Sequence, residues 1–266
     1  THSSSSMEEA SMFKMPTIDL SAKSLLMLSQ LGIFMVFAYW SIEDGAGDNL
    51  DYVFFAMMSA AGLALFFSVP NARMGVTLGI PAVMVVMGLA TGEYGIMFWA
   101  VFMLLMIGPI AYMPALASGD STLDLDDESR KMRLGILWIV FALFMMAMMS
   151  ELLVMAVDGE VTEEDEDGND VFTMTLDSTQ QTIAQIGLAI GVIGVLVFLL
   201  TALVGMELGP MLPWHGGAMA AGAMLISQYL WSVGEGAPSM VAGDIAFILC
   251  IIGLTILPPC IAYRSE

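Results

Sequence analysis

The segment Leu123-Asp-Leu-Asp-Asp-Glu-Ser-Arg-Lys-Met-Arg133 decides how this chain folds, because it holds three of the seven basic residues and divides two similar apolar halves. Around it, 58% of the 266 residues are hydrophobic, only 13% are charged, and the mean hydropathy is +0.82. Soluble domains carry about 25% charged residues. The composition therefore excludes an ordinary soluble domain and predicts a polytopic membrane protein.

Eight apolar runs are each close to the ~20 residues that a helix needs to cross a bilayer. Gly-, Pro- or acid-rich breaks of the kind that end helices separate them. We therefore expect an all-α membrane protein with eight transmembrane helices, of which the third is the least regular because Gly79 and Pro81 interrupt it. The runs lie near residues 24–42, 52–69, 74–90, 94–116, 134–157, 182–205, 211–233 and 245–263.

The distribution of charge predicts an orientation, because cytoplasmic loops are enriched in Lys and Arg. With a cytoplasmic N-terminus and eight spans, all seven basic residues fall on the inner side, and the outer segments hold acidic residues without a single Lys or Arg. We expect a cell-membrane protein with both termini in the cytoplasm. The outer acidic residues are Glu43, Asp44, Asp48, Asp51, Glu93, those within 158–170, Asp177, Glu235 and Asp244.

An internal repeat predicts how the spans are grouped. The stretch from Glu93 to Ile110-Ala-Tyr112 aligns without a gap with the stretch from Asp244 to Ile261-Ala-Tyr263. We expect two tandem four-helix units in the same orientation, residues 23–116 and 133–264. A polar cytoplasmic segment, 1–22, would precede them, a cytoplasmic linker, 117–132, would join them, and the second unit would carry an acidic outer loop, 158–180.

Ionisable residues near the spans are candidate sites, because burying a charge in the bilayer costs at least ~2.5 kcal/mol. Glu151, Asp244 and Glu93 are expected near the outer boundary. They have two interpretations, which are interfacial carboxylates at helix ends or a cation or proton site at an outer mouth.

Two further stretches hold clustered polar groups. In the inner turn before the seventh run, Glu207 and His215 could bond to each other, or His215 could be an interfacial anchor. The acidic run 160–170 is a solvated loop that gathers cations or an ordered Ca²⁺ site, although Gly168 lies too early for EF-hand spacing. Apart from the Ca²⁺ alternative, no metal site or cofactor is expected. A haem is excluded because His2 and His215 cannot supply paired axial ligands.

Function is predicted by elimination. No catalytic motif is present, so we expect no enzyme, and the middle of the bilayer is free of the carboxylates that coupled transporters use. We therefore expect a channel or facilitator for a small solute or cation. The alternative is a non-catalytic subunit of a larger membrane complex, packed through small-residue faces such as Gly187-x-x-x-Gly191. Expected partners are the lipid bilayer and either a second copy or other membrane subunits, not nucleic acid. Candidate polar lining residues are Gln30, Thr77, Gln185, Thr201 and Gln228.

Overall fold

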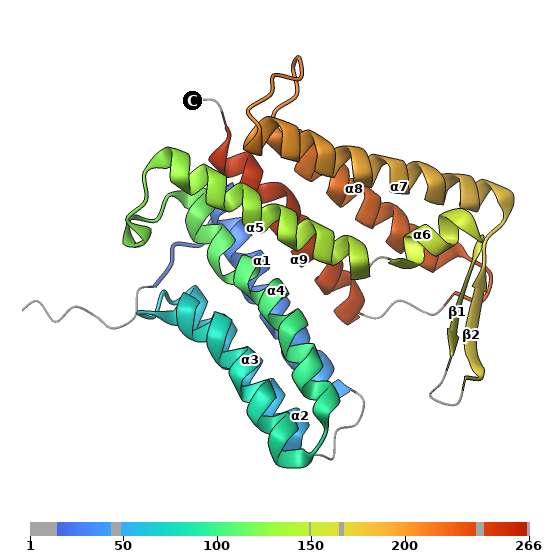
Figure 1. Ribbon diagram of the computed structural model, residues 1–266, viewed down its shortest axis with the longest axis horizontal. Coiled ribbons are helices and arrows are strands. Elements are labelled where there is room, and N and C mark those ends of the chain that lie inside the picture. Colours follow the sequence, from blue (N-terminus) through green and yellow to red (C-terminus); the bar gives the residue numbers. More distant parts are fainter. Residues whose placement is uncertain (1–14, 44–48, 149, 165–167, 238–241, 265–266) are drawn as a thin grey trace, which may run out of the picture.

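The computed structural model describes residues 15–43, 49–148, 150–164, 168–237 and 242–264, and helices dominate it (Figure 1). The first half contains α1(Ala22–Glu43), α2(Asn49–Phe66), α3(Ala72–Thr91) and α4(Tyr94–Ser118). A short 3-10 turn, η1(Ser121–Leu123), leads to the second half. That half contains α5(Asp127–Met148), α6(Ser150–Val157), β1(Glu160–Glu164), β2(Asp170–Thr175), α7(Ser178–Phe198), the π-helical turn η2(Leu199–Leu203), α8(Pro213–Val233) and α9(Ala242–Ala262).

Six helices of the described chain are long and apolar enough to cross a membrane: α1, α2, α3, α4, α7 continued through η2, and α9. The class predicted from composition, a helical membrane protein, agrees with this structure. The predicted runs near 134–157 and 211–233 correspond to α5 with α6 and to α8, which fall outside this set of six.

The third span differs from the sequence expectation, because it is one uninterrupted helix despite Gly79 and Pro81. Proline removes a single backbone hydrogen bond, here to the Thr77 carbonyl, and helices in membranes tolerate such a loss where neighbouring groups compensate. The fifth run is covered by α5 and α6, which lie on either side of residue 149, outside the described residues.

The acidic segment after α6 forms an antiparallel β-hairpin, which the sequence analysis did not foresee. Val161 pairs with Met174 in the register of β1 and β2, and both side chains are buried beneath the hairpin. Phe172 stacks on Trp231 of α8 with the ring centroids 5.8 Å apart. The alternation of buried and exposed residues thus fixes the hairpin against the ends of the helices.

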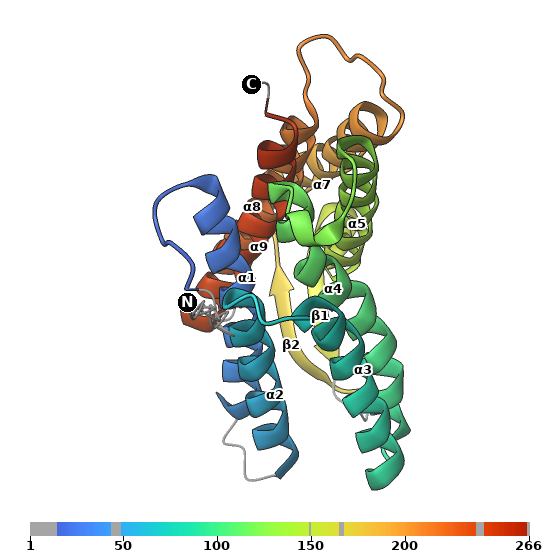
Figure 2. The same cartoon turned by 90° about the vertical axis from the view of Figure 1, so that its left-hand side faces the viewer.

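The helices form two packed groups that share an interface. In the first half, α1 packs on α2 and α3 on α4, and in the second half α8 lies between α7 and α9. The groups meet where α1 contacts α9 and α4 contacts α5 and α9. The α4–α5 connection, the loop between η2 and α8, and the C-terminus lie toward one end of the molecule, and the hairpin lies toward the other (Figures 1 and 2).

Glycines let α7 and α8 approach closely within the chain, whereas the sequence analysis assigned the small-residue face of Gly187 to contacts with another subunit. A methyl group added at Gly187 would lie 2.7 Å from Ile226, and one at Gly194 would lie 2.7 Å from the carbonyl oxygen of Gly216. Since lipid offers no hydrophobic drive between helices, such close packing supplies much of their attraction. The face that carries Gly187 and Gly194 is therefore used within the chain.

Candidate functional site

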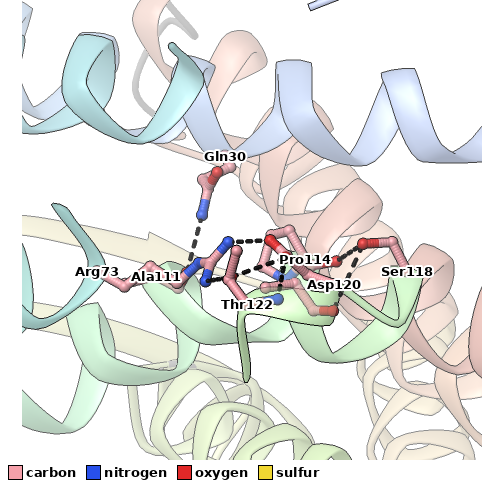
Figure 3. A network of polar contacts seen from close by, with 8 residues as sticks. Gln30, Arg73, Ala111, Pro114, Ser118, Asp120 and Thr122 are labelled. Atoms are coloured by element: carbon pink, nitrogen blue, oxygen red, sulfur yellow. Dashed lines mark hydrogen bonds and ion pairs between the residues drawn. The ribbon is translucent and has the colours of Figure 1, made fainter. Parts of the chain in front are cut away.

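A polar network at the α4–α5 connection joins two turns of the chain. Figure 3 shows Arg73 of α3 reaching across to Asp120 and Thr122, which follow the end of α4. The guanidinium forms an ion pair with Asp120 and donates a hydrogen bond of 3.1 Å to the Thr122 hydroxyl. The backbone N–H of Thr122 also donates to Asp120, at 2.9 Å. The α2–α3 turn is thus held against the connection between the two halves.

Hydrogen bonding to the charged form controls the titration of Asp120. Partial burial raises its pKa, but the backbone and hydroxyl hydrogen bonds from Thr122 and the charge of Arg73 outweigh burial. The pKa of Asp120 therefore lies below its usual range.

The basic residues of the linker cap the end of α4. Arg130 donates from Nη1 to the carbonyl oxygens of Leu116 and Ala117, at 2.6 and 3.1 Å. Carbonyls in the last turn have no N–H of the next helical turn to pair with, although the Gly119 N–H also donates to Leu116 at 3.4 Å. A cation at a helix C-terminus also interacts well with the helix dipole. Tyr263, beyond α9, donates its hydroxyl proton to the Lys131 carbonyl at 3.0 Å. The linker that the sequence singled out is consequently the junction of α4, α5 and α9.

Sequence reasoning did not assign these roles to Arg73 and Asp120. A signal was present, since Gly119 adopts the left-handed conformation that ends a helix and Asp120-Ser-Thr122 has the pattern of an Asx turn. The sequence could not predict that Asp120 forms an ion pair with Arg73, which belongs to another turn.

Two prolines within helices free carbonyl groups that side chains from other helices then satisfy. Pro114 has no N–H to donate to the Ile110 carbonyl four residues earlier. The buried amide of Gln30 on α1 donates to that oxygen at 2.8 Å and to the next carbonyl, of Ala111, at 3.3 Å. Figure 3 shows Gln30 pointing from α1 toward α4.

The second case lies in the other half of the chain. Pro259 of α9 leaves the Thr255 carbonyl without its helical partner. The indole N–H of Trp138 on α5 donates to this oxygen at 2.7 Å, and Trp138 is fully buried. Its ring stacks on Phe198 of α7 with a centroid separation of 4.1 Å. Trp138 therefore joins three helices of the second half.

Thr77 on α3 is a buried polar group of a different kind. Its hydroxyl oxygen is buried and has no hydrogen-bond partner within the described residues. Its methyl group faces α4, where a Cβ added at Gly108 would lie 3.5 Å away. Pro81 also frees the carbonyl of Thr77. Where α3 packs on α4, the Thr77 hydroxyl is thus left without a hydrogen-bond partner among the described residues.

Carboxylates gather at the end of the molecule that carries the hairpin. Glu151 is the second residue of α6 and is half-buried, and the carboxylate of Glu163 on β1 lies close enough to repel its charge. On the neighbouring α7, the Gln181 amide donates to the Val157 carbonyl at 3.0 Å. The Gln181 hydrogen bond holds the end of α6 against the start of α7.

The other predicted candidates lie apart from Glu151. Glu93 precedes α4 and is exposed, and Asp244 lies in the first turn of α9. Glu207 is exposed in the loop before α8. His215 accepts a hydrogen bond at Nδ1 from the Leu212 N–H at 2.8 Å and so caps α8. Among the described residues no three His, Cys, Asp or Glu side chains are grouped as a metal site requires; residues 165–167 of the acidic run lie outside that part.

The predicted polar lining residues also serve separate helices. Gln185 donates to the Ala156 carbonyl of α6, and Thr201 donates to Val197 within its own helix. Gln30 and Thr77, by contrast, both face α4. Gln228 is half-buried on α8, so Gln30 and Thr77 are the two of the five that face the same helix.

The arrangement defines a polytopic helical membrane protein with polar networks at its helix ends. Comparisons with protein families, with curated proteins and with solved structures find no match to this chain.

Proposed function

We propose that this protein is a passive channel or facilitator for a small solute or cation. The observation that carries the proposal is the position of charge. In the described helices, ionisable Asp, Glu, Lys, Arg and His side chains lie within the first or last two turns, as Asp51, Arg73, Glu151, His215 and Asp244 illustrate. Transporters coupled to protons or sodium usually have such a group, or a broken helix, near the midplane.

Carboxylates at the outer end support a preference for cations. Glu151 is half-buried beside Glu163, and the hairpin adds exposed acidic residues such as Glu160. Clefts lined by one sign of charge raise the local concentration of the opposite ion. The outer end would therefore enrich cations at the entry to the route.

We further infer eight membrane crossings. The helices α7 and α8 are antiparallel. Gly187 of α7 lies against Ile226 of α8, and Gly194, further along α7, lies against Gly216, nearer the start of α8. Since α8 accompanies α7 in this way, α8 would span the same depth. The two ends of the α5–α6 segment are likewise fixed to other helices, through Arg130 on α4 and Gln181 of α7.

The two tandem units find support in a shared type of contact. In each half, the first helix donates a side-chain N–H to a carbonyl that a proline of the last helix has freed, from Gln30 to Ile110 and from Trp138 to Thr255. The interfaces between halves are also reciprocal, α1 with α9 and α4 with α5. In the repeat alignment Ile110 corresponds to Ile261, so the two contacts lie at different depths.

We propose that the protein lies in the cell membrane with both termini in the cytoplasm. Arg73, Arg130 and Lys131 lie together at one end through their contacts. The positive-inside tendency then places that end in the cytoplasm.

The second candidate is a non-catalytic subunit of a larger complex. It is favoured by the exposed aromatic residues Phe98 and Trp99 on α4, which are 64% and 53% exposed. Aromatic residues are enriched where proteins meet. Other membrane subunits, or a second copy, would be the partners.

Flux through liposomes separates these candidates. We expect purified protein to pass a monovalent cation or a small neutral solute down its gradient without a coupled proton. Glu151→Gln should lower cation flux by up to about tenfold, because it removes a charge from the outer end. Glu207→Gln, in the exposed inner loop, is the matched control and should leave flux near the wild-type value.

Absence of flux for every ion and neutral solute tested would remove the channel proposal. Purification from native membranes in a fixed ratio with other chains would then establish the subunit.

A further inference from the structure

The hydroxyl group of Thr77 differs from those of other threonines in the helices. Four of these donate a hydrogen bond of 2.6 to 2.9 Å to the carbonyl oxygen four residues earlier: Thr91, Thr182, Thr201 and Thr255. The Thr77 hydroxyl oxygen is buried, yet it has no partner within the described residues. Thr77 therefore does not use the carbonyl of Arg73, which is the acceptor that the same pattern would give it.

The Thr77 side chain lies at a depth where the membrane offers no substitute. Thr77 is about 8 Å along α3 from its start at Ala72, and Gly108, which it contacts, is about 15 Å before the end of α4 at Ser118. Both helices are long and apolar enough to cross a bilayer. The hydrocarbon core contains no group that can bond to a hydroxyl. A partner for Thr77 must therefore be held by the protein.

The stretch of α4 that faces Thr77 carries a freed carbonyl group. A Cβ added at Gly108 would lie 3.5 Å from Cγ2 of Thr77, so these two residues face each other. Pro109 follows Gly108 and has no N–H to donate to the carbonyl of Leu105, four residues earlier. The Thr77 hydroxyl does not bond to that oxygen, because it bonds to no atom in the described part of the chain. A hydroxyl and a freed carbonyl thus lie on facing stretches without a direct bond.

There is room for a small molecule beside Gly108. Apart from the adjacent residues and the backbone of its own helix, Cγ2 of Thr77 is the only described atom within 4 Å of a Cβ added there. The space would thus accept a methyl group, which is close in size to one water molecule.

The chemistry of the two groups identifies the occupant. The Thr77 hydroxyl needs an acceptor for its proton, whereas the Leu105 carbonyl needs a donor. A metal ion supplies neither, and a lipid acyl chain also supplies neither. Water supplies both, and buried waters bridge polar groups of this kind.

We propose that one ordered water molecule is bound between α3 and α4. It accepts a hydrogen bond from the Thr77 hydroxyl and donates one to the Leu105 carbonyl. At Pro109 it does what the Gln30 amide does at Pro114, where a side chain reaches the freed carbonyl directly. The site is independent of the proposed transport function, because it belongs to the contact between two helices.

Water-edited solid-state NMR of the full chain in proteoliposomes detects such a molecule. Magnetisation passes from water protons to nearby ¹³C-labelled threonine methyl groups, and Thr77→Val assigns the Thr77 signal by its loss. Thr255 is the internal control, because it is buried about 10 Å before the end of α9 and its hydroxyl donates to Ile251. We expect the Thr77 methyl group to receive several-fold more magnetisation than that of Thr255 at short mixing times.

Gly108→Ala tests the position of the water. Its methyl group fills the space at an ordinary contact distance from Thr77, so the chain should fold and the transfer to Thr77 should be lost. Gly79→Ala on α3, where no atom lies within 4 Å of the added methyl group, is the matched control and should keep the transfer. Equal transfer to Thr77 and Thr255 in the wild type would overturn the proposal, since the Thr77 hydroxyl would then donate to the Arg73 carbonyl. Unchanged transfer to Thr77 in Gly108→Ala would also overturn it.

Discussion

At the scale of single residues, the stability of this protein depends on side chains that satisfy carbonyls freed by proline. Gln30 and Trp138 are both buried, and each donates to a carbonyl that lies four residues before a proline. In a bilayer no water replaces such a bond. Each proline should therefore be energetically coupled to its donor, Pro114 to Gln30 and Pro259 to Trp138. A double-mutant cycle can measure this coupling.

Trp138→Phe tests this coupling. Loss of the N–H leaves the Thr255 carbonyl unpaired, and we expect unfolding free energy in detergent to fall by about 1 to 2 kcal/mol. In a Pro259→Ala background the same substitution should cost less, because the substituted alanine restores a backbone N–H that can donate to the Thr255 carbonyl. Trp99→Phe, at an exposed tryptophan, should change stability by less than about 0.5 kcal/mol. Equal costs of Trp138→Phe in both backgrounds would contradict the coupling.

Acid should weaken the inner network through Asp120. Because its folded pKa lies below the unfolded value of about 3.9, the stabilisation is complete above that value and is lost as pH falls through the folded pKa. We expect Asp120→Asn to lower the melting temperature at pH 7. The corresponding loss in the free energy of unfolding should be below about 1 kcal/mol, because the ion pair is partly exposed. The difference from wild type should vanish in the most acidic samples. A difference that is constant with pH would show that the carboxylate charge is not the cause.

At the scale of helices and strands, the sequence predicted most boundaries correctly because bilayer thickness imposes a length on apolar runs. The run 94–116 became α4(Tyr94–Ser118) and the run 245–263 became α9(Ala242–Ala262).

The hairpin was not predicted, because residues 158–180 were interpreted from their charge alone. Residues Val171-Phe-Thr-Met-Thr175 nevertheless have the β-branched, alternating character of a strand. The candidate site was likewise predicted only in part. Glu151 could be placed near the outer boundary from its distance to Arg133, but its neighbour Glu163 depends on the fold of the hairpin.

The contact between α7 and α8 predicts opposite effects of two similar substitutions. Gly194→Ala places a methyl group 2.7 Å from the Gly216 carbonyl oxygen, so we expect a loss of about 1 to 3 kcal/mol. Gly222→Ala, on the same helix pair, has no atom within 4 Å of its added methyl group and should stabilise by up to about 1 kcal/mol. Denaturant titration in micelles measures both. If Gly194→Ala were neutral, the helices would not be in close contact.

At the scale of the whole molecule, the two ends of the bundle should lie on opposite sides of the membrane. In a background with Cys250→Ala and Cys260→Ala, Thr173→Cys of the hairpin and Ser121→Cys of the linker are both at exposed positions. We expect an impermeant thiol reagent added to intact cells to label Thr173→Cys and to label Ser121→Cys only after lysis. Labelling of both in intact cells would refute the proposed topology and the route built on it.

The hairpin has a consequence for solubility outside the membrane. Its sheet has two strands, and backbone hydrogen bonds between Thr175 and Glu235 cover one end of the β2 edge. The outer edge of β1 is therefore the side that could pair with another molecule. The exposed carboxylates of Glu160, Glu163 and Asp170 oppose such growth, because two copies aligned edge to edge would place like charges together. Neutralising these side chains would leave an uncharged β-edge at the protein surface, and aggregation would begin there rather than at the helices.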